Sequence, residues 1–364
     1  MQENILQMIN QLSKEKGVHP SFIVNAIKEA IREAAKKYYK AKDIVSLDFD
    51  ERTGEVIVLV KKKVVQKVSN PEKEISWEQA RKLNPNVKIG NIIPVNASAE
   101  ILGRISAQTA KQIIFQKVSE AEKLYIYNEF YPKIGTLVNG VVRRFDNDSV
   151  IIDLEKAEGI LKRKERPANE SYNRGDRVKA VIIDVLKNSK GPQVILSRSD
   201  NLFLKRLMEL EIPEIADGTI EIKGIARLPG ERAKVAVYSK HKDVDPVGSC
   251  IGVKGGRIGA ILKELKGEKI DIFQWSPSLE EFVKNTLSPA KILSVRRLDE
   301  KEKKLEVVVP ESQLSVAIGK KGQNVKLASK LLGWQLEIKT SEEKMKEMGE
   351  ILSANNERGS DGKD

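Results

Sequence analysis

Two short glycine loops in this sequence are copies of each other. The first occupies residues 251–255 and reads Ile-Gly-Val-Lys-Gly, and the second occupies residues 318–322 and reads Ile-Gly-Lys-Lys-Gly. Their first glycines lie 67 residues apart (319 − 252), and the apolar residues after each loop fall into register. An internal repeat of this kind predicts two copies of one structural unit, so part of the chain must fold as a tandem pair.

The two copies also share one predicted order of secondary structure. In each, a helix and two strands precede a short helix and the glycine loop, and an amphipathic helix and a final strand follow. The expected elements are 202–210, 220–226, 234–239, 247–250, a helix to 265 and 270–275 in the first copy, and 279–287, 290–298, 303–310, 313–318, a helix to 332 and 334–339 in the second. This α-β-β-α-α-β order predicts two type II KH modules.

The chemistry of the loops also favours a KH module. Neither loop has the Gly-x4-Gly-Lys-Ser/Thr sequence of a nucleotide P-loop, and the chain has no Gly-x-Gly-x-x-Gly dinucleotide fingerprint. In a KH module the Gly-x-x-Gly loop clamps the backbone of about four nucleotides. The glycines let phosphates approach the N-terminus of the next helix, where unpaired N–H groups favour anions. One such motif is often only a turn, but two in matched surroundings are specific. The residues predicted to contact RNA here are Gly252, Val253, Lys254, Gly255, Arg257, Gly319, Lys320, Lys321, Gly322 and Asn324.

Composition supports a polyanionic partner and argues against catalysis. The 364 residues carry a formal net charge of +12, which favours nucleic acid ahead of a membrane surface. One cysteine and two histidines cannot build a disulfide, a zinc cluster or a His-dependent nucleophile triad. We therefore expect no catalytic residue, no metal and no cofactor, and a cytoplasmic protein without a membrane span. Cys250 takes the place that Ala317 fills in the second copy, which indicates a packing role.

Residues 135–200 form a predicted barrel ahead of the repeats. About five short strands separated by glycine and polar turns suit an OB-fold, whose surface binds single-stranded nucleic acid. A basic cluster in this region is explained equally well by RNA binding and by a solvated turn, and its lone phenylalanine by stacking or by a place in the core. The candidate RNA contacts in the barrel are Arg143, Arg144, Phe145, Lys162, Arg163 and Lys164.

The N-terminal region, residues 1–134, has no ligand chemistry of its own. Its pattern predicts helices over 5–12 and 22–38, a hairpin of strands (44–50 and 55–62), a capped short helix from Ser76, a strand at 92–96 and a long helix over 105–127. Helices on a small sheet fit an α/β protein-docking domain. The whole chain is then multidomain α+β, with expected boundaries 1–134, 135–200, 201–277, 278–340 and a tail over 341–364 that begins as a short helix and becomes disordered.

Several further stretches carry a resemblance to a known family. They are Gly103–Gln112, Lys190–Arg198, Glu211–Gly218, Asp245–Gly252, Gly267–Ile272 and Leu314–Asn324. Together they resemble the bacterial NusA family of transcription elongation factors, over nearly the whole chain from residue 1 to about 340. The resemblance implies an N-terminal domain that docks on RNA polymerase core, an OB barrel of the ribosomal-protein type and two KH modules. It implies binding of nascent single-stranded RNA and of other Nus-type factors, and modulation of pausing, termination and antitermination. We expect a monomer.

The barrel departs from the family's pattern. Lys162 stands where the family usually has a proline, and the next turn reads Pro-Ala-Asn-Glu at 167–170 in place of Pro-Gly-Glu. The contacts of the barrel are therefore the least safely transferred. Two alternatives also stay open: KH and OB modules occur in translation and RNA-processing factors, and an RNA-processing enzyme could use acidic metal ligands, although no suitably spaced Asp/Glu cluster is present.

Overall fold

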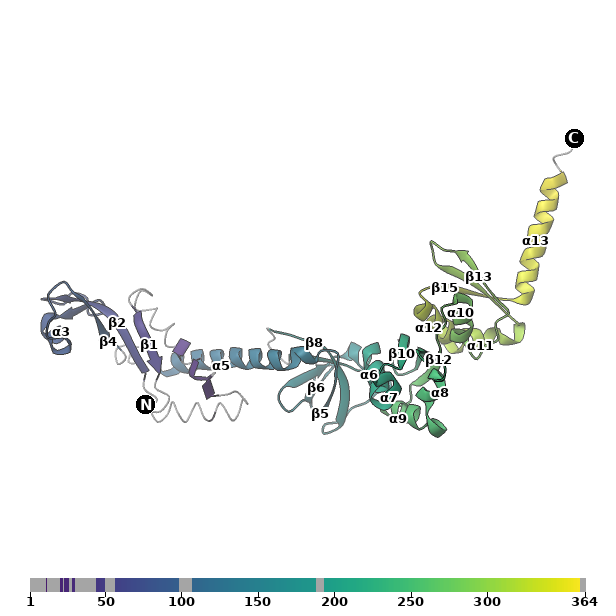
Figure 1. Cartoon of the computed structure of the whole chain (residues 1–364). Coiled ribbons are helices and arrows are strands. Elements are labelled where there is room, and N and C mark those ends of the chain that lie inside the picture. Colours follow the sequence, from purple (N-terminus) through teal and green to yellow (C-terminus); the bar gives the residue numbers. More distant parts are fainter. Residues whose placement is uncertain are drawn as a thin grey trace. The chain divides into compact units, whose positions relative to one another are not determined.

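The computed structural model describes residues 11, 20, 21, 23–25, 28, 29, 44–49, 56–97, 107–187 and 193–360. The chain forms two compact units (Figure 1): Met1–Pro132 with Val185–Gln193, and Lys133–Asp184 with Val194–Asp364. The predicted helices at 5–12 and 22–38 and the start of the long helix lie outside the described residues, apart from isolated positions.

The first unit contains a small mixed sheet and a long helix. Strand β2 pairs with β1, β3 and β4, and the β1–β2 pair is antiparallel, as the hairpin prediction requires. The hydroxyl of Ser76 accepts a hydrogen bond from the Gln79 main-chain N–H at 3.3 Å and so caps helix α3. The elements are β1 (Ile44–Phe49), β2 (Val56–Val65), β3 (Glu74–Ser76), α3 (Trp77–Leu83), β4 (Ile92–Asn96) and α5 (Ala107–Phe130).

The second unit begins with a closed five-stranded barrel, which confirms the OB-type prediction. The strands follow the closed order β5-β6-β7-β9-β8. Their inward-facing residues, such as Val150, Ile152 and Leu196, are fully buried. The strands are β5 (Leu137–Asp146), β6 (Ser149–Asp153), β7 (Glu158–Leu161), β8 (Arg177–Val185) and β9 (Val194–Ser197).

The first KH module has the predicted type II arrangement. Strand β11 lies at the centre of a three-stranded sheet, antiparallel to β10 and parallel to β12. Phe203, Val235 and the fully buried Cys250 belong to its core, which agrees with a packing role for the cysteine. The elements are α6 (Asn201–Glu211), α7 (Pro213–Ala216), β10 (Ile220–Leu228), β11 (Arg232–Ser239), α8 (Pro246–Ile251), α9 (Gly256–Glu264) and β12 (Lys269–Gln274).

The second KH module repeats this arrangement. Strand β14 is antiparallel to β13 and parallel to β15, and Ala317 is buried at the position that Cys250 occupies in the first module. Leu305, Val307 and Val309 on alternate positions of β14 form the floor of the core. The elements are α10 (Leu279–Leu287), β13 (Ser294–Asp299), β14 (Lys304–Val309), α11 (Leu314–Ile318), α12 (Gln323–Leu332) and β15 (Gln335–Thr340).

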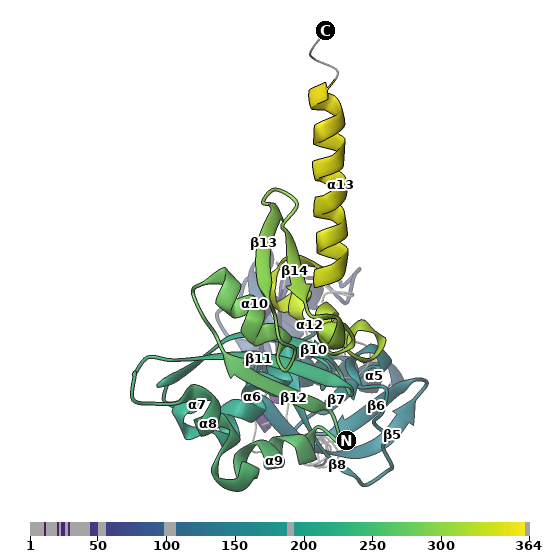
Figure 2. The same ribbon diagram turned by 90° about the vertical axis from the view of Figure 1, so that its right-hand side faces the viewer.

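The helix that follows each glycine loop also carries the contact with the preceding module. Glu264 on α9 and Leu331 on α12 occupy the same repeat position (331 − 264 = 67). Glu264 contacts Arg198 at the end of the barrel. Leu331 lies close to Gly224 of the first KH sheet, since a Cβ built on Gly224 would be 2.9 Å from Cδ1 of Leu331. Figure 2 shows the sheet β10–β12 between its own helices α8 and α9 and the helices α10 and α12 of the second module.

The C-terminal segment begins with a helix, as the sequence predicts, and this helix is longer than the expected short extension. A helix, α13, covers Ser341–Ser360. Thr340 and Glu343 form a reciprocal capping box at its start, with N···O distances of 2.9 and 3.2 Å. Lys344 in its first turns reaches the buried carboxylate of Glu306 at 2.7 Å. These contacts hold the start of the helix against strand β14 of the second KH module.

Candidate nucleic-acid interface

The two glycine loops have the same backbone conformation. The first glycines, Gly252 and Gly319, have φ/ψ of 73/175° and 73/172°. The second glycines, Gly255 and Gly322, have φ/ψ of 74/18° and 71/15°. All four lie at positive φ, which glycine adopts without a steric penalty. The repeat in the sequence therefore encodes two copies of one loop geometry.

The lysine before each second glycine also has a left-handed conformation. Lys254 has φ/ψ of 50/27° and Lys321 has 53/27°. This conformation costs an L-residue about 1–2 kcal/mol, so both loops keep a local strain of the kind found at functional sites. Both side chains are exposed, as are Lys320 and Val253, the latter at 89%. The loops thus present two lysines in the second module, but one lysine and one valine in the first.

The helix after each loop begins without a side-chain cap. Gly255 is the N-cap of α9 and Gly322 is the N-cap of α12, and neither supplies a side chain to the first-turn N–H groups. The first turns also contain no acidic residue. The positive ends of both helix dipoles are therefore open to an anion at the glycine loops.

The two glycines of each loop have different surroundings. A Cβ built on Gly252 would lie 2.8 Å from Cγ of Arg257, and one on Gly319 would lie 2.7 Å from Cβ of Asn324. By contrast, a Cβ on Gly255 would meet its nearest atom at 3.9 Å, and one on Gly322 would meet nothing within 4 Å. The first glycine therefore makes room for packing inside the module, whereas the second borders open space.

The structure changes the interpretation of Arg257 and Asn324, which the sequence predicts to be RNA contacts. Asn324 is 3% exposed, and its Nδ2 donates to the main-chain oxygens of Ala317, Val316 and Leu287 at 3.0, 3.2 and 3.2 Å. This burial places the Asn324 side chain inside the module. Nη1 of Arg257 donates to Ser249 O at 2.8 Å and is held by the Glu214 carboxylate at 2.9 Å.

No local sequence signal separates Arg257 and Asn324 from the residues that face solvent. Both follow the second glycine by two positions, at the start of an amphipathic helix. Their closeness to the first glycine of each loop is visible only in the folded module.

The aromatic and basic residues of strand β5 lie on the barrel surface. Phe145 is 51% exposed, so the alternative of a core position is wrong. Both arginines donate hydrogen bonds to the Glu158 carboxylate. The bond from Arg143 is 3.2 Å long. Arg144 donates through Nη2 at 2.8 Å and also through Nη1. The hydrogen bond from Arg144 lowers the pKa of the Glu158 carboxyl below its usual value. This carboxylate offsets part of the charge of the arginine pair.

The basic cluster that follows β7 is solvent-exposed. Lys162, Arg163 and Lys164 are all exposed. Lys162 immediately precedes a short 3₁₀ helix, Arg163–Glu165, which contains the other two. Lys164 lies 3.6 Å from Glu165, and among the residues that the structure describes no ion pair holds Lys162 or Arg163. The geometry fits both an anion contact and a solvated turn.

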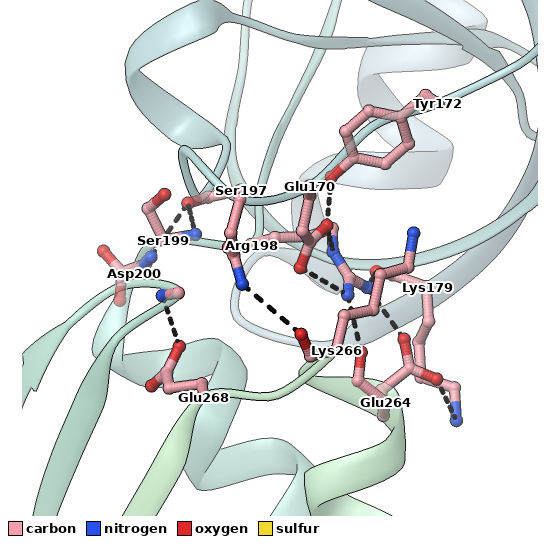
Figure 3. Close-up of polar contacts among 12 residues, drawn as sticks. Glu170, Tyr172, Lys179, Ser197, Arg198, Ser199, Asp200, Glu264, Lys266 and Glu268 are labelled. Atoms are coloured by element: carbon pink, nitrogen blue, oxygen red, sulfur yellow. Dashed lines mark hydrogen bonds and ion pairs between the residues drawn. The ribbon is translucent and has the colours of Figure 1, made fainter.

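A buried polar network joins the barrel to the first KH module (Figure 3). Arg198, which follows β9, is 1% exposed and forms a bidentate ion pair with Glu170 of the barrel at 2.7 and 2.8 Å. It also donates to Lys179 O at 2.6 Å, and to both Oε1 and the main-chain oxygen of Glu264 at 2.8 Å each. Because its guanidinium meets groups from both modules, Arg198 fixes the barrel against helix α9.

A second buried ion pair extends this network into the first KH sheet. Arg227 and Glu268 are both fully enclosed and bind each other at 2.6 and 2.9 Å. Arg227 also donates to the main-chain oxygen of Arg198 at 2.8 Å. The Phe203 ring lies against both guanidinium groups, and its centroid is 4.7 Å from Cζ of Arg198 and 5.8 Å from Cζ of Arg227. Sequence reasoning missed this network, because nothing in the local pattern pairs residues 66 positions apart (264 − 198).

The described part of the chain contains no group of three or more His, Cys, Asp or Glu side chains that could hold a metal ion. A search of the same residues finds no helix with the length and apolar character of a membrane span.

These features define a class of protein: a nucleic-acid-binding protein with an OB-type barrel and tandem KH modules. The family models that match the sequence are the NusA N-terminal domain over residues 4–124, the S1 RNA binding domain over 131–198, the NusA-like first KH domain over 198–275 and the NusA-like second KH domain over 279–346. The chain belongs to the NusA family.

Curated relatives match nearly the full length of the chain. The transcription termination/antitermination protein NusA of Bacillus subtilis is 45% identical over 349 residues, which cover 96% of this chain and 94% of that protein. The protein of the same name from Halalkalibacterium halodurans is 43% identical and the one from Thermus thermophilus is 40% identical, covering 96% and 94% of this chain and 91% of each relative.

Proposed function

We propose that this chain binds nascent single-stranded RNA with its second unit, docks on RNA polymerase with its first unit, and thereby modulates pausing, termination and antitermination. The names of its relatives, transcription termination/antitermination protein NusA, support the process. The observation that carries the RNA-binding part is the repeated loop geometry, in which open space at the second glycine borders an uncapped helix N-terminus.

In this proposal each loop holds RNA phosphates at the start of the following helix. The exposed lysines supply counter-charge, and the side-chain-free second glycine allows the close approach of the RNA backbone. Ile251 and Ile318, both partly exposed beside the loops, offer apolar surface to the bases. The proposed loop contacts are Gly252, Val253, Lys254, Gly255, Gly319, Lys320, Lys321 and Gly322.

The barrel extends the same surface. An exposed aromatic ring such as Phe145 stacks on bases of any sequence, a contact worth about 1–3 kcal/mol per base. Arg143, Arg144, Lys162, Arg163 and Lys164 supply the cationic surroundings. Because the buried network fixes the barrel against α9, the barrel and the first loop bind RNA as parts of one preformed surface.

The first unit supplies the docking surface for the polymerase in this proposal. The match to the NusA N-terminal domain supports this assignment. Three large apolar side chains near α3 and β4 are unusually exposed: Leu83 at 61%, Ile89 at 55% and Ile92 at 65%. Exposed apolar side chains close together in the sequence suit a protein partner better than a nucleic acid.

A pausing assay tests the proposed function. RNA polymerase transcribes a template with a hairpin-dependent pause, with and without the full chain, and we expect the chain to lengthen the pause. A variant with Leu83→Asp and Ile92→Asp should lose the effect on pausing and co-purification with polymerase while keeping its RNA affinity. Unchanged pausing together with co-sedimentation only with ribosomes would favour the translation alternative and contradict the proposal.

A further inference from the structure

The two KH modules make the same contact across their glycine loops with different side chains. Arg257 and Asn324 occupy equivalent repeat positions, and so do their acceptors Ser249 and Val316, because both pairs are 67 residues apart (324 − 257 and 316 − 249). In the first module the donor is a guanidinium, at 2.8 Å from the acceptor oxygen. In the second it is a carboxamide, at 3.2 Å. We call this contact the loop latch.

The acceptors of the loop latch are carbonyls that a helix end leaves without partners. The last four C=O groups of a helix make no intrahelical hydrogen bond. Ser249 lies near the end of α8, and Val316 and Ala317 lie near the end of α11. The latch therefore joins the end of the helix before the loop to the start of the helix after it, and so sets the angle at which the loop connects them.

Each latch also reaches the N-terminal helical segment of its module. Arg257 pairs with Glu214 on α7, at 2.9 Å, and Asn324 donates to the main-chain oxygen of Leu287 at the end of α10, at 3.2 Å. Three elements thus meet at one side chain in both modules. The side chain passes so close beneath the first glycine that a Cβ there would lie within 2.8 Å of it.

We propose that Arg257 and Asn324 are positioning residues that hold the two glycine loops in the RNA-binding conformation without touching RNA. The inference rests on the proposed function, because it assigns a role to the loops that bind RNA there. The latch offsets the strain of the left-handed Lys254 and Lys321 and keeps the first-turn N–H groups of α9 and α12 directed to the open side of the loop.

The charge of Arg257 is the main alternative, since a guanidinium beside a phosphate loop could bind the phosphate directly. Its Nη1 is already shared between Glu214 and Ser249 O, and the side chain is about one-third exposed. The second module performs the same function with a neutral side chain that is buried. A neutral donor at position 257 should therefore replace the arginine.

The test compares two substitutions that remove the same charge from the full chain. Arg257→Asn gives the first module the donor of the second, whereas Arg257→Met fills the space without a donor. Affinity for a single-stranded RNA is measured over a series of salt concentrations. We expect Arg257→Asn to bind within about threefold of the parent, and Arg257→Met to bind about tenfold more weakly, the effect of losing one charge-assisted hydrogen bond. The slope of log affinity against log salt should stay unchanged in both, because no phosphate contact is lost.

Hydrogen exchange of the free protein provides a second measurement. Arg257→Met should accelerate exchange of the loop and first-turn amides at 255–258, and Arg257→Asn should not. If both variants lose affinity equally and the slope becomes shallower by about 0.7, Arg257 is a phosphate ligand and the inference is wrong. Unchanged affinity in both variants overturns it as well. A parent chain that does not bind RNA contradicts the proposed function instead, so the two failures are distinguishable.

Discussion

Arg198 holds Glu264 at two points, donating 2.8 Å hydrogen bonds to its carboxylate and to its main-chain oxygen. Glu264 is the last residue of α9, and the first glycine loop lies at the opposite end of the same helix. One arginine from the end of the barrel therefore fixes the far end of a helix whose N-terminus is the proposed phosphate site. Rigid linkage of consecutive binding surfaces raises the affinity for a ligand that spans them.

Glu264→Ala should weaken binding only of RNA long enough to reach both the barrel and the first loop. The substitution removes the carboxylate contact but leaves the Arg198–Glu170 pair intact, so we expect a loss of about three- to tenfold for the long RNA. Affinity for an RNA that fills only the KH loops should not change. Glu280→Ala is the control, since it changes the charge equally at an exposed position of α10. Equal losses for both RNAs would contradict the coupling.

The ion pair of Arg198 and Glu170 should contribute most to the stability of the contact between the barrel and the first KH module. Arg198→Met leaves a buried carboxylate without its cation, which typically costs about 3–5 kcal/mol. Lys284→Met, which breaks an exposed pair with Glu280, should cost less than about 0.5 kcal/mol. Urea unfolding of both variants compares the two free energies. A similar small loss in both would show that the network contributes little.

The two glycines of a loop should respond differently to the same substitution. Gly322→Ala carries the left-handed penalty of about 1 kcal/mol, because Gly322 has φ/ψ of 71/15°. Gly319 has φ/ψ of 73/172°, a conformation that is essentially restricted to glycine, so Gly319→Ala is strained at least as much. Only Gly319→Ala also forces a Cβ to 2.7 Å from Asn324, which adds about 1–3 kcal/mol of overpacking. Urea unfolding of the two variants should therefore differ by more than about 1 kcal/mol. Equal destabilisation would contradict the division of roles.

Cys250 should be unreactive in the folded chain. Burial raises the pKa of its thiol to about 12, with Glu214 as a further cause, so the reactive thiolate is scarce at pH 8. We expect a disulfide reagent to label the native chain at least about a hundredfold more slowly than the urea-unfolded chain, because labelling requires opening of the core. Rapid labelling of the native chain at pH 8 would contradict the packing role.

The sequence was sufficient for features that depend on local pattern. Repetition of the glycine loops predicted two modules of one fold, and five short strands predicted the barrel, both of which the structure confirms. The capping box of Thr340 and Glu343 is a local signal too, and it marks the start of α13, where a short helix was predicted. The loop positions themselves were also visible, since glycine spacing specifies where positive φ is tolerated.

The remaining features depend on residues that only the fold brings together. Arg198 contacts Glu264 between the barrel and the first KH module. Asn324 donates to main-chain oxygens of the two other helices α10 and α11. A hydrophilic residue beside a glycine loop has the same local pattern whether it binds phosphate or satisfies a carbonyl. The packing of the module decides the outcome, because it determines which carbonyl groups the side chain meets.

Binding of single-stranded RNA by matched double variants tests the central claim most directly. Gly255→Asp with Gly322→Asp is compared with Gly255→Asn with Gly322→Asn, because Asp and Asn have the same shape and both tolerate the left-handed conformation. The parent should show a slope of log affinity against log salt of about −0.7 per phosphate contacted. We expect the Asn pair to keep binding within a few fold and the Asp pair to lose at least about a hundredfold, since two carboxylates would face the phosphates at the helix N-termini. Equal affinity of the two variants would show that these loops do not hold the RNA backbone.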